Sequence, residues 1–458
     1  MKNWCYTGGL WALVVGVLGW GGVSAVARDA EGAQPNVVLM FVDNVGYGDL
    51  GCYGNEEVKT PRMDGLAAEG VLCTDFYIGS PSCMPSRGAL MTGRSPVRNG
   101  LNEQIYQIDE LEQTSLPLRE KLFPEYLKEL GYATACFGKW NLGFAPGHRP
   151  TERGFDEYLG NISGNCDYYT HIYNGRPDFY RGTEPVEIKG YTTDIIAEAA
   201  CEFMWRHRDA PFFVYVPFNA AHFPNAKNKP PGEPVIWQAT DWAFGQYGYD
   251  PGTLDERERY RAVLTALDHG VGRILDALDE LKLADETIVI LLSDNGAFMI
   301  PGRGLECASN LPLKAGGQEL YEGGIRVPCV VRWPGVTEAG TVCEEPLWSM
   351  DLLPTAVAAA GGQVSEDRVL DGKDVRAVLA GEAVSPHEHL CFHYEGRDAI
   401  REGKWKLYRR RAISPWELFD LETDIGETAN RAAAHPDVVE RLAAVFEKWK
   451  ADAELRSD

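Results

Sequence analysis

Uninterrupted apolar runs mark the strands that this chain is expected to form. One run covers residues 37–42 and a second covers residues 287–292, and both contain β-branched residues. Shorter runs follow at residues 133–137 and 211–217. A strand that is apolar on both faces belongs in the middle of a parallel sheet covered by helices. The pattern therefore predicts an α/β protein with a large, mostly parallel central sheet and helices on both faces.

Segments with helical spacing of apolar residues lie between these runs. Residues 118–130, 194–205 and 256–281 show it, and the last of these segments leads directly into a predicted strand. Helices that alternate with strands along the chain pack on the two faces of such a sheet. The order of the elements thus agrees with the fold class predicted from the strands.

The last part of the chain has a different pattern. Residues 398–410 and 416–430 are predicted to form antiparallel strands around turns, and residues 438–449 form an amphipathic helix. We therefore expect two domains. The larger α/β domain covers residues 35–375, and a small C-terminal α+β subdomain covers residues 376–458.

The first 27 residues are predicted to be a secretory signal peptide. Lys2 gives a basic start, residues 10–19 are apolar, and Ala-Val-Ala at 25–27 is a small-x-small cleavage site. An uncleaved membrane anchor is the weaker alternative, because the apolar run is too short to span a bilayer comfortably. No later segment approaches the roughly 18 uninterrupted apolar residues of a membrane helix. The mature protein is expected to be exported to the periplasm or the exterior, without a membrane attachment.

The acidic balance of the chain limits its partners. With 67 acidic and 44 basic residues, the 458-residue chain has a formal net charge of −23. This charge argues against nucleic acid as a partner, and an anionic substrate would need a local basic pocket. The chain has 11 cysteines, without the paired spacing of a metal site. The nine other than Cys5 and Cys83 are candidates for disulfides in an oxidising compartment, although the sequence assigns no pairs.

Two Asp-Asn pairs follow the two most apolar strands. Asp43 and Asn44 come directly after the first run, and Asp294 and Asn295 come just after the run at residues 287–292. Ligands of parallel sheets bind at the carboxyl ends of strands. Carboxylate and amide oxygens suit Ca²⁺ or Mg²⁺. Either pair alone is more typical of a turn, but together they predict a metal site.

The most informative stretch is Cys-Met-Pro-Ser-Arg at residues 83–87. The proline fits the first turn of a helix, so Cys83 is predicted to stand at a helix start. Free backbone N–H groups and the helix dipole favour an anion there. Arg87, one turn further on, adds a cation that can fork onto an oxyanion. A buried thiol beside a surface charge is the alternative that a lone cysteine would suggest.

Three motifs make the chain resemble the sulfatases of the alkaline phosphatase superfamily. They are C-x-P-S-R at residues 83–87, its continuation LMTGR at 90–94, and EGGIRVP at 322–328. The resemblance implies that residues 35–375 form the catalytic domain. It also implies that a formylglycine-generating enzyme oxidises Cys83 to formylglycine, whose hydrated aldehyde is the nucleophile.

The resemblance also implies roles for the polar residues at the predicted sheet edge. The family binds a divalent metal ion, usually Ca²⁺, with Mg²⁺ as an alternative. Arg87 and Lys139 would neutralise the sulfate, Lys139 and His222 would contact the substrate, and His222 would protonate the leaving alcohol. Residues 225–255 are expected to form a long loop over this edge. The implied metal ligands are Asp43, Asn44, Cys83 as formylglycine, Asp294 and Asn295.

Three positions depart from the family pattern. The family usually has an aspartate at Asn44, a histidine that helps turnover at Asn141, and a lysine at Gly317. Asn44 removes one anion and Gly317 removes one cation, so the local charge sum is unchanged. We therefore expect a retuned anion pocket, in which Lys314 substitutes as a substrate-binding cation.

The leading hypothesis is an exported sulfatase that hydrolyses the sulfate esters of sulfated carbohydrates or aryl sulfates. The altered positions Asn141 and Gly317 favour an alternative, a catalytically impaired homologue that binds sulfated glycans. A third hypothesis keeps the fold and changes the substrate to phosphate or phosphonate esters.

Overall fold

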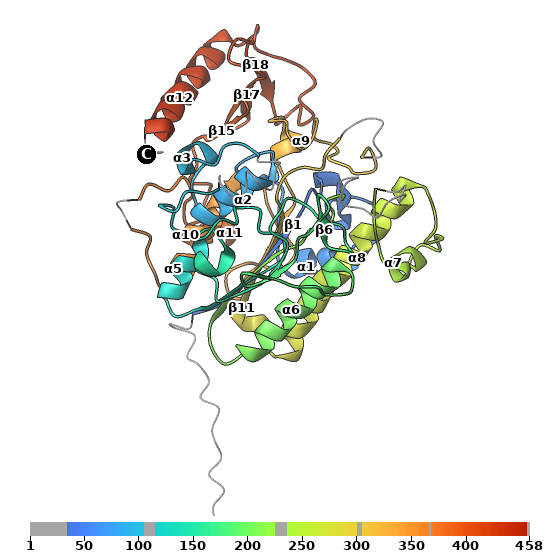
Figure 1. The fold of residues 1–458 in the computed structure, drawn as a ribbon. Helices are drawn as coiled ribbons and strands as arrows, with labels where there is room; N and C mark the ends of the chain where they lie inside the picture. Colours follow the sequence, from blue (N-terminus) through green and yellow to red (C-terminus); the bar gives the residue numbers. More distant parts are fainter. Residues whose placement is uncertain (1–33, 105–114, 225–235, 300–304, 366–367, 456–458) are drawn as a thin grey trace, which may run out of the picture. The chain divides into compact units, whose positions relative to one another are not determined.

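The computed structural model describes residues 34–104, 115–224, 236–299, 305–365 and 368–455 (Figure 1). The predicted signal peptide, residues 1–27, lies outside them. Among the described helices, none combines the length and the apolar character that a membrane span requires.

A ten-stranded mixed sheet forms the centre of the structure, in the order β13-β2-β12-β11-β1-β10-β4-β5-β8-β9. Its middle is parallel, as predicted: β11 (Thr287–Ser293), β1 (Asn36–Val42), β10 (Phe212–Pro217), β4 (Ala133–Phe137) and β5 (Glu157–Gly160) run in one direction. The outer strands are β13 (Thr341–Cys343), β2 (Val71–Cys73), β12 (Cys329–Arg332), β8 (Tyr180–Arg181) and β9 (Glu184–Pro185), and antiparallel pairs occur only among these and their neighbours.

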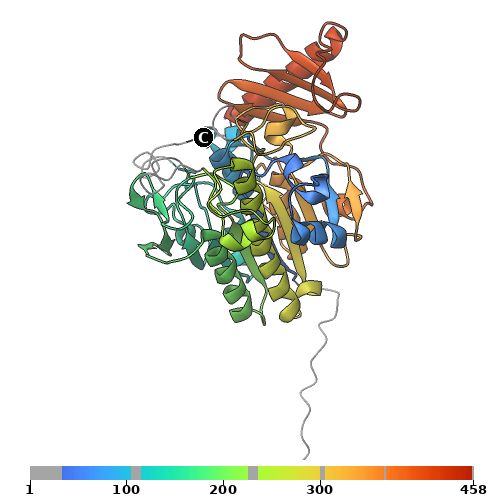
Figure 2. The ribbon, with the colours of Figure 1, turned by 90° about the vertical axis from the view of Figure 1, so that its right-hand side faces the viewer.

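Both faces of β1 are buried, which explains its continuous apolar sequence. Val38, Met40 and Val42 pack toward α1 (Pro61–Glu69), α6 (Thr192–Arg206) and α8 (Glu256–Glu280). The alternate residues pack on the opposite face, toward α2 (Cys83–Thr92), α5 (Phe123–Glu129) and α10 (Leu352–Ala359). Figures 1 and 2 show α6 and α8 side by side. The predicted α/β class with helices on both faces is confirmed.

Two predicted elements differ from the structure. The helix expected over residues 118–130 is shortened to α5, because Pro124 is accommodated in the first turn of a helix but not in its interior. The loop expected over residues 225–255 contains α7 (Asp241–Gly245), whose start is capped by the Thr240 side chain. Residues 225–235 of that loop lie outside the described residues.

The C-terminal part forms the predicted antiparallel sheet and helix. The order is β15 (Leu390–Tyr394), β16 (Arg397–Glu402), β17 (Trp405–Arg409) and β18 (Glu417–Asp420). The helix α12 (Pro436–Leu455) lies beside this sheet, in red in Figure 1. Its Leu442 and Phe446 pack on the sheet. The domain boundary near residue 375 stays a prediction.

Short elements connect these parts. They are β3 (Phe76–Tyr77), paired with β14 (Leu347–Trp348); β6 (Ile172–Tyr173), paired with β7 (Arg176–Pro177); and the helices α3 (Pro96–Asn99), α9 (Glu322–Ile325) and α11 (Arg376–Leu379).

Candidate active site

Four central strands deliver polar residues to one edge of the sheet. Asp43 follows β1, Asp294 follows β11, Lys139 follows β4, and His222 follows β10. Because these strands are parallel, their carboxyl ends meet at the same edge. The Asp294 N–H donates to the Val42 carbonyl at 2.9 Å, which fixes the two aspartates beside each other. The predicted convergence is therefore present in the structure.

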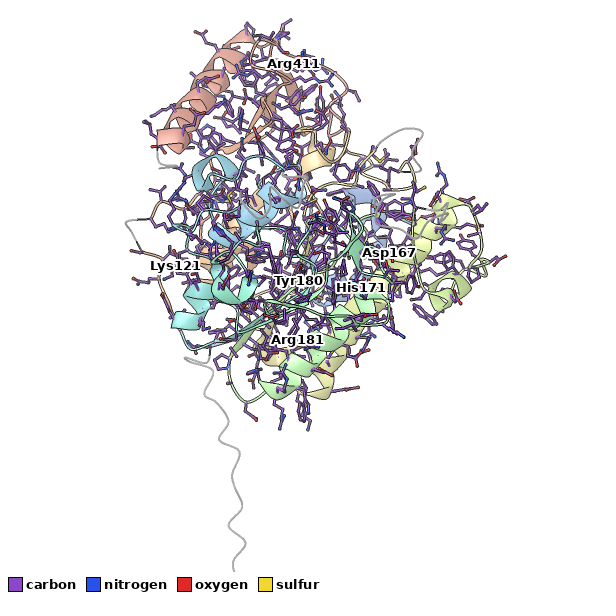
Figure 3. The ribbon with its side chains drawn as sticks, in the orientation of Figure 1. Lys121, Asp167, His171, Tyr180, Arg181 and Arg411 are labelled. Carbon is purple, nitrogen blue, oxygen red and sulfur yellow. The ribbon has the colours of Figure 1, made fainter. Side chains whose placement is uncertain are left out.

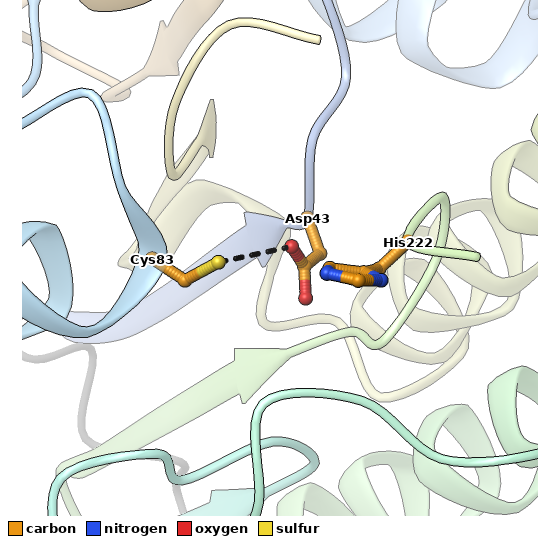
Figure 4. Close-up of side chains that lie close together, drawn as sticks. All are labelled: Asp43, Cys83 and His222. Atoms are coloured by element: carbon orange, nitrogen blue, oxygen red, sulfur yellow. Dashed lines mark hydrogen bonds between the residues drawn. The ribbon is translucent and has the colours of Figure 1, made fainter. Parts of the chain in front are cut away.

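Cys83 is the first residue of α2, and its thiol points into this edge. The Cys83 Sγ lies 4.0 Å from Asp43 Oδ1, and a ring nitrogen of His222 lies within 4.8 Å of ligand atoms of both (Figure 4). Burial raises the pKa of the Cys83 thiol to about 12. A thiol that stays protonated at neutral pH is a poor nucleophile. The unmodified Cys83 side chain is therefore poorly suited to attack a substrate in this site.

Two buried cations balance two buried anions around the thiol. Arg87 Nη2 lies 2.7 Å from Asp294 Oδ2 and 3.5 Å from Asp43 Oδ2. Lys139 Nζ lies 2.5 Å from Asp43 Oδ2, and none of these four side chains is exposed. Buried charges are retained only when they are paired in this way. The four formal charges add to zero.

The asparagine side chains complete the oxygen-rich side of this cluster. Asn44 has φ 57°, a left-handed conformation that asparagine tolerates, and its N–H donates to Asp294 Oδ1 at 3.0 Å. Its side-chain oxygen accepts from Asn295 Nδ2 at 2.6 Å. Asn295 Oδ1 is buried and has no partner in the structure. A buried amide oxygen beside two carboxylates is a donor set that fits a hard divalent cation.

His222 has a defined tautomer. Its Nδ1 lies 2.7 Å from the Phe223 carbonyl oxygen. A carbonyl only accepts, so Nδ1 carries the proton and the neutral ring keeps Nε2 as a bare acceptor. Burial, and then Lys139, lowers the pKa of His222 to about 3. The predicted role as a proton donor therefore requires that Nε2 first gains a proton.

Asn141 lies in the same buried region, two residues after Lys139. It is completely buried, and both polar atoms of its amide are without a partner. A Cβ added to Gly164 would lie 3.7 Å from Asn141 Oδ1, so the amide faces residues that follow β5. This amide is not a base at neutral pH, but it offers one donor and one acceptor to a ligand.

Lys314 is not brought together with these residues. Its Nζ donates to the Glu427 carbonyl oxygen at 3.0 Å and lies 3.9 Å from the centre of the Tyr321 ring. These contacts direct the ammonium toward α9 and the C-terminal part. The structure gives no support to the expectation that Lys314 replaces the cation missing at Gly317. Lys314 is therefore not part of the proposed site.

Two serines that sequence reasoning did not assign hold the site in shape. Ser86 Oγ donates to the Asp294 carbonyl oxygen at 2.5 Å, which ties α2 to the end of β11. Ser293 Oγ donates to the Asn295 carbonyl oxygen at 3.0 Å and accepts from the Val45 N–H. Ser86 stands inside the C-x-P-S-R motif, but its partner is about 200 residues away and cannot be read from the motif.

The loop after β5 holds His222 in position through hydrogen bonds. Asp167 and His171, labelled in Figure 3, belong to this loop. The Asp167 carboxylate caps a turn by accepting from the Thr170 N–H at 2.7 Å. Between them, the Tyr168 hydroxyl donates to the His222 carbonyl oxygen at 2.8 Å. The position of His222 is thus fixed by buried hydrogen bonds.

Comparisons with known proteins identify a family for this chain. A family model described as Sulfatase matches residues 35–362, and one described as N-sulphoglucosamine sulphohydrolase, C-terminal, matches residues 318–452. N-acetylgalactosamine-6-sulfatase from Canis lupus familiaris is 34% identical over 443 residues, covering 90% of this chain and 80% of that protein. Arylsulfatase A from Homo sapiens is 32% identical over 480 residues, covering 91% of this chain and 87% of that protein.

A solved structure is similar over nearly the whole length. The crystal structure of Ps i-CgsB in complex with k-i-k-neocarrahexaose has a TM-score of 0.82 and 31% identity to this chain. The match covers 93% of this chain and 94% of that one, so the likeness includes the C-terminal sheet as well as the large sheet.

Proposed function

The chain belongs to the sulfatase family and is a sulfuric ester hydrolase; on this premise, we propose that it acts on sulfated carbohydrates with a formylglycine derived from Cys83. The observation that carries the proposal is the position of Cys83. It begins a ten-residue helix, 4.0 Å from Asp43, in a buried cluster with Arg87 and Lys139. A reactive group there faces free helix N–H groups and two cations, which is the environment that a sulfate requires.

Conversion of Cys83 gives the site the nucleophile that the buried thiol lacks. Formylglycine supplies, as its hydrate, a hydroxyl that attacks sulfur and a second hydroxyl that permits release of sulfate. Arg87 and Lys139 would hold positive charge where the sulfate oxygens bind, and because both side chains are completely buried, bulk solvent would screen it little. The Nδ1 proton of His222 is held by the Phe223 carbonyl, so Nε2 is the atom that would take up the proton released by the attacking hydroxyl and pass it to the leaving alcohol.

The same cluster fits a divalent metal ion. Asp43, Asn44, Asp294, Asn295 and the residue at position 83 would hold it, and the unpartnered Asn295 Oδ1 is the observation that supports this donor set. Oxygen donors favour Ca²⁺, with Mg²⁺ as the alternative. A bound ion would lower the pKa of the attacking hydroxyl. It would also turn a neutral cluster into a positive one, which attracts a sulfate ester despite the acidic surface of the chain.

The proposed substrate class rests on the relatives. One is named for a sulfated N-acetylgalactosamine, and the solved structure holds a neocarrahexaose. We extend this preference for carbohydrate to the present chain, with export by the predicted signal peptide and maturation by a formylglycine-generating enzyme as parts of the proposal.

A panel of esters tests the function. Sulfated monosaccharides and oligosaccharides, an aryl sulfate, and phosphate and phosphonate monoesters should be compared at equal concentration. We expect release of sulfate from a sulfated sugar at a kcat/KM above that for every phosphorus ester. Tight binding of sulfated sugars without turnover would support the binding homologue that Asn141 suggested, and faster phosphonate hydrolysis would support the third hypothesis.

Removal of the metal is expected to lower both activity and thermal stability. An ion present at 100 times its dissociation constant stabilises the folded state by about 2.7 kcal/mol, so a chelator should lower Tm by several degrees. Adding Ca²⁺ back should restore both properties. In Asn295→Ala, which removes the unpartnered oxygen, Tm should respond much less to the chelator. Equal Tm values with and without chelator in the wild type would refute the metal site.

A further inference from the structure

Gly317 and Phe298 meet beside the reactive cluster. The Gly317 N–H donates to the Ala297 carbonyl oxygen at 3.0 Å, and the next N–H, from Gln318, donates to the Pro81 carbonyl oxygen at 2.7 Å. Pro81 lies two residues before Cys83. These bonds fix Gly317 between the segment that follows β11 and the segment that precedes α2.

The Phe298 ring occupies the space that a side chain at position 317 would need. A Cβ built on Gly317 would lie 2.9 Å from the Gly296 carbonyl oxygen and 3.0 Å from both Cδ1 and Cε1 of Phe298. These separations are tighter than an ordinary van der Waals contact, so the carbonyl group and the ring together exclude a side chain at position 317. The glycine therefore does not leave a hole in the site, because an aromatic side chain from the strand exit fills it.

Phe298 packs directly on the proton-transferring residue. The Phe298 ring is edge-to-face with His222, with ring centres 6.2 Å apart, and edge-to-face with Phe223 at 6.4 Å. His222 is buried, whereas Phe298 is only partly buried. Phe298 thus lies next to the residue that would pass a proton to the leaving group.

We infer that Phe298 is a specificity-determining residue, an aromatic wall that binds the apolar face of the sugar carrying the sulfate. The inference rests on the proposed function and deepens it. The ester oxygen that His222 protonates is bonded to a sugar carbon, so the sugar ring lies next to Phe298. A pyranose presents C–H groups on one face, which pack well on an aromatic ring. Position 317, without a side chain, adds no charge to this wall.

The test uses N-acetylgalactosamine 6-sulfate and inorganic sulfate as probes. In Phe298→Ala, we expect the dissociation constant and KM for the sulfated sugar to rise about tenfold, with kcat changed less than about twofold. The inhibition constant of inorganic sulfate should not change, because sulfate binds to the cations and not to the wall. Phe298→Tyr keeps the aromatic face and should restore the affinity for the sugar.

Trp205→Ala is the matched control. Trp205 is an aromatic residue near the end of α6 that is 59% exposed, and it precedes β10, so it lies at the opposite edge of the sheet. Trp205→Ala should change neither the dissociation constant for the sulfated sugar nor the inhibition constant of inorganic sulfate. Equal loss of affinity for sugar and inorganic sulfate in Phe298→Ala would show a structural defect and overturn the wall. A wild type that binds the sugar no more tightly than sulfate would overturn it too.

Different experimental results would refute the role of Phe298 as an aromatic wall and the proposed function. Hydrolysis of sulfated sugars that does not depend on Phe298 would refute the wall alone. Binding that depends on Phe298, in a fully formylglycine-loaded protein that releases no sulfate, would refute the proposed hydrolysis alone.

Discussion

Cys83→Ala is expected to lower kcat/KM for a sulfated sugar by about 10³-fold or more, because the reaction loses its nucleophile. The remaining cluster would still bind the substrate through Arg87 and Lys139, so the affinity for inorganic sulfate should stay within a few-fold of the wild type. The loss should therefore appear in kcat rather than in binding. Rates and sulfate inhibition constants, measured on the same preparations, distinguish a loss of kcat from a loss of binding.

Modification of Cys83 is measured separately. Mass spectrometry of the peptide that contains residue 83 should show an aldehyde in place of the thiol when the host supplies the converting enzyme. Cys83→Ser retains a hydroxyl but lacks the second one, so it should release at most one alcohol per molecule and then stop. Cys391→Ala, which removes another buried thiol in the C-terminal sheet, is the matched control and should keep full activity. Full activity in Cys83→Ala would overturn the proposed nucleophile.

The strand ends of the site were predictable from the sequence. An apolar run such as residues 37–42 must be buried on both faces, and parallel strands place their carboxyl ends together. The structure confirms that Asp43 and Asp294 lie side by side. The prediction succeeded because it depended only on the direction of the strands, which the alternation of strands and helices fixes.

The loop after β11 was not predictable in the same way. The spacing of Lys314 and Gly317 suggested that one side chain replaces another. In the structure, Lys314 is held by Glu427 and Tyr321, whereas Phe298 fills the space at Gly317. The direction of a loop side chain is decided by distant packing partners, and Glu427 is 113 residues away along the chain. Local patterns carry no such information.

The expected balance of charge receives a structural explanation. Among the described residues of the cluster, Asp43 and Asp294 pair with Lys139 and Arg87, and every buried ionic group has an opposite charge within 3.5 Å. Among these side chains alone, without a bound metal ion, a further aspartate at position 44 would add an anion without a cation. Because uncompensated buried charge is costly, the asparagine at position 44 agrees with the absence of a cation at position 317.

Arg87→Met is expected to destabilise the protein by about 3–5 kcal/mol, because it leaves the buried Asp294 carboxylate without its cation and Asp43 with Lys139 alone. The Arg87 guanidinium contacts Asp294 and Asp43, donates to the Lys139 carbonyl oxygen at 3.1 Å, and is completely buried. The guanidinium carbon lies 5.1 Å from the centre of the Phe41 ring, so the loss on substitution by methionine includes this cation–π contact as well as the ion pairs. Urea unfolding of both proteins, with a chelator present, measures the difference.

The pH dependence of this loss has a definite sign. Burial, and then Asp43, already raises the pKa of Asp294 in the wild type, and removal of Arg87 raises it further. A group whose pKa is higher in the folded state favours folding below that pKa and loses this contribution as the pH rises through it. The destabilisation should therefore be smaller near pH 5 than near pH 8.

Arg206→Met is the matched control, since Arg206 pairs with Glu157 through two contacts but is 43% exposed. Arg206→Met should lower the free energy of unfolding by less than about 1 kcal/mol, because exposed ion pairs contribute little to stability. Equal losses from the two substitutions would show that the buried cluster contributes no more than a surface ion pair.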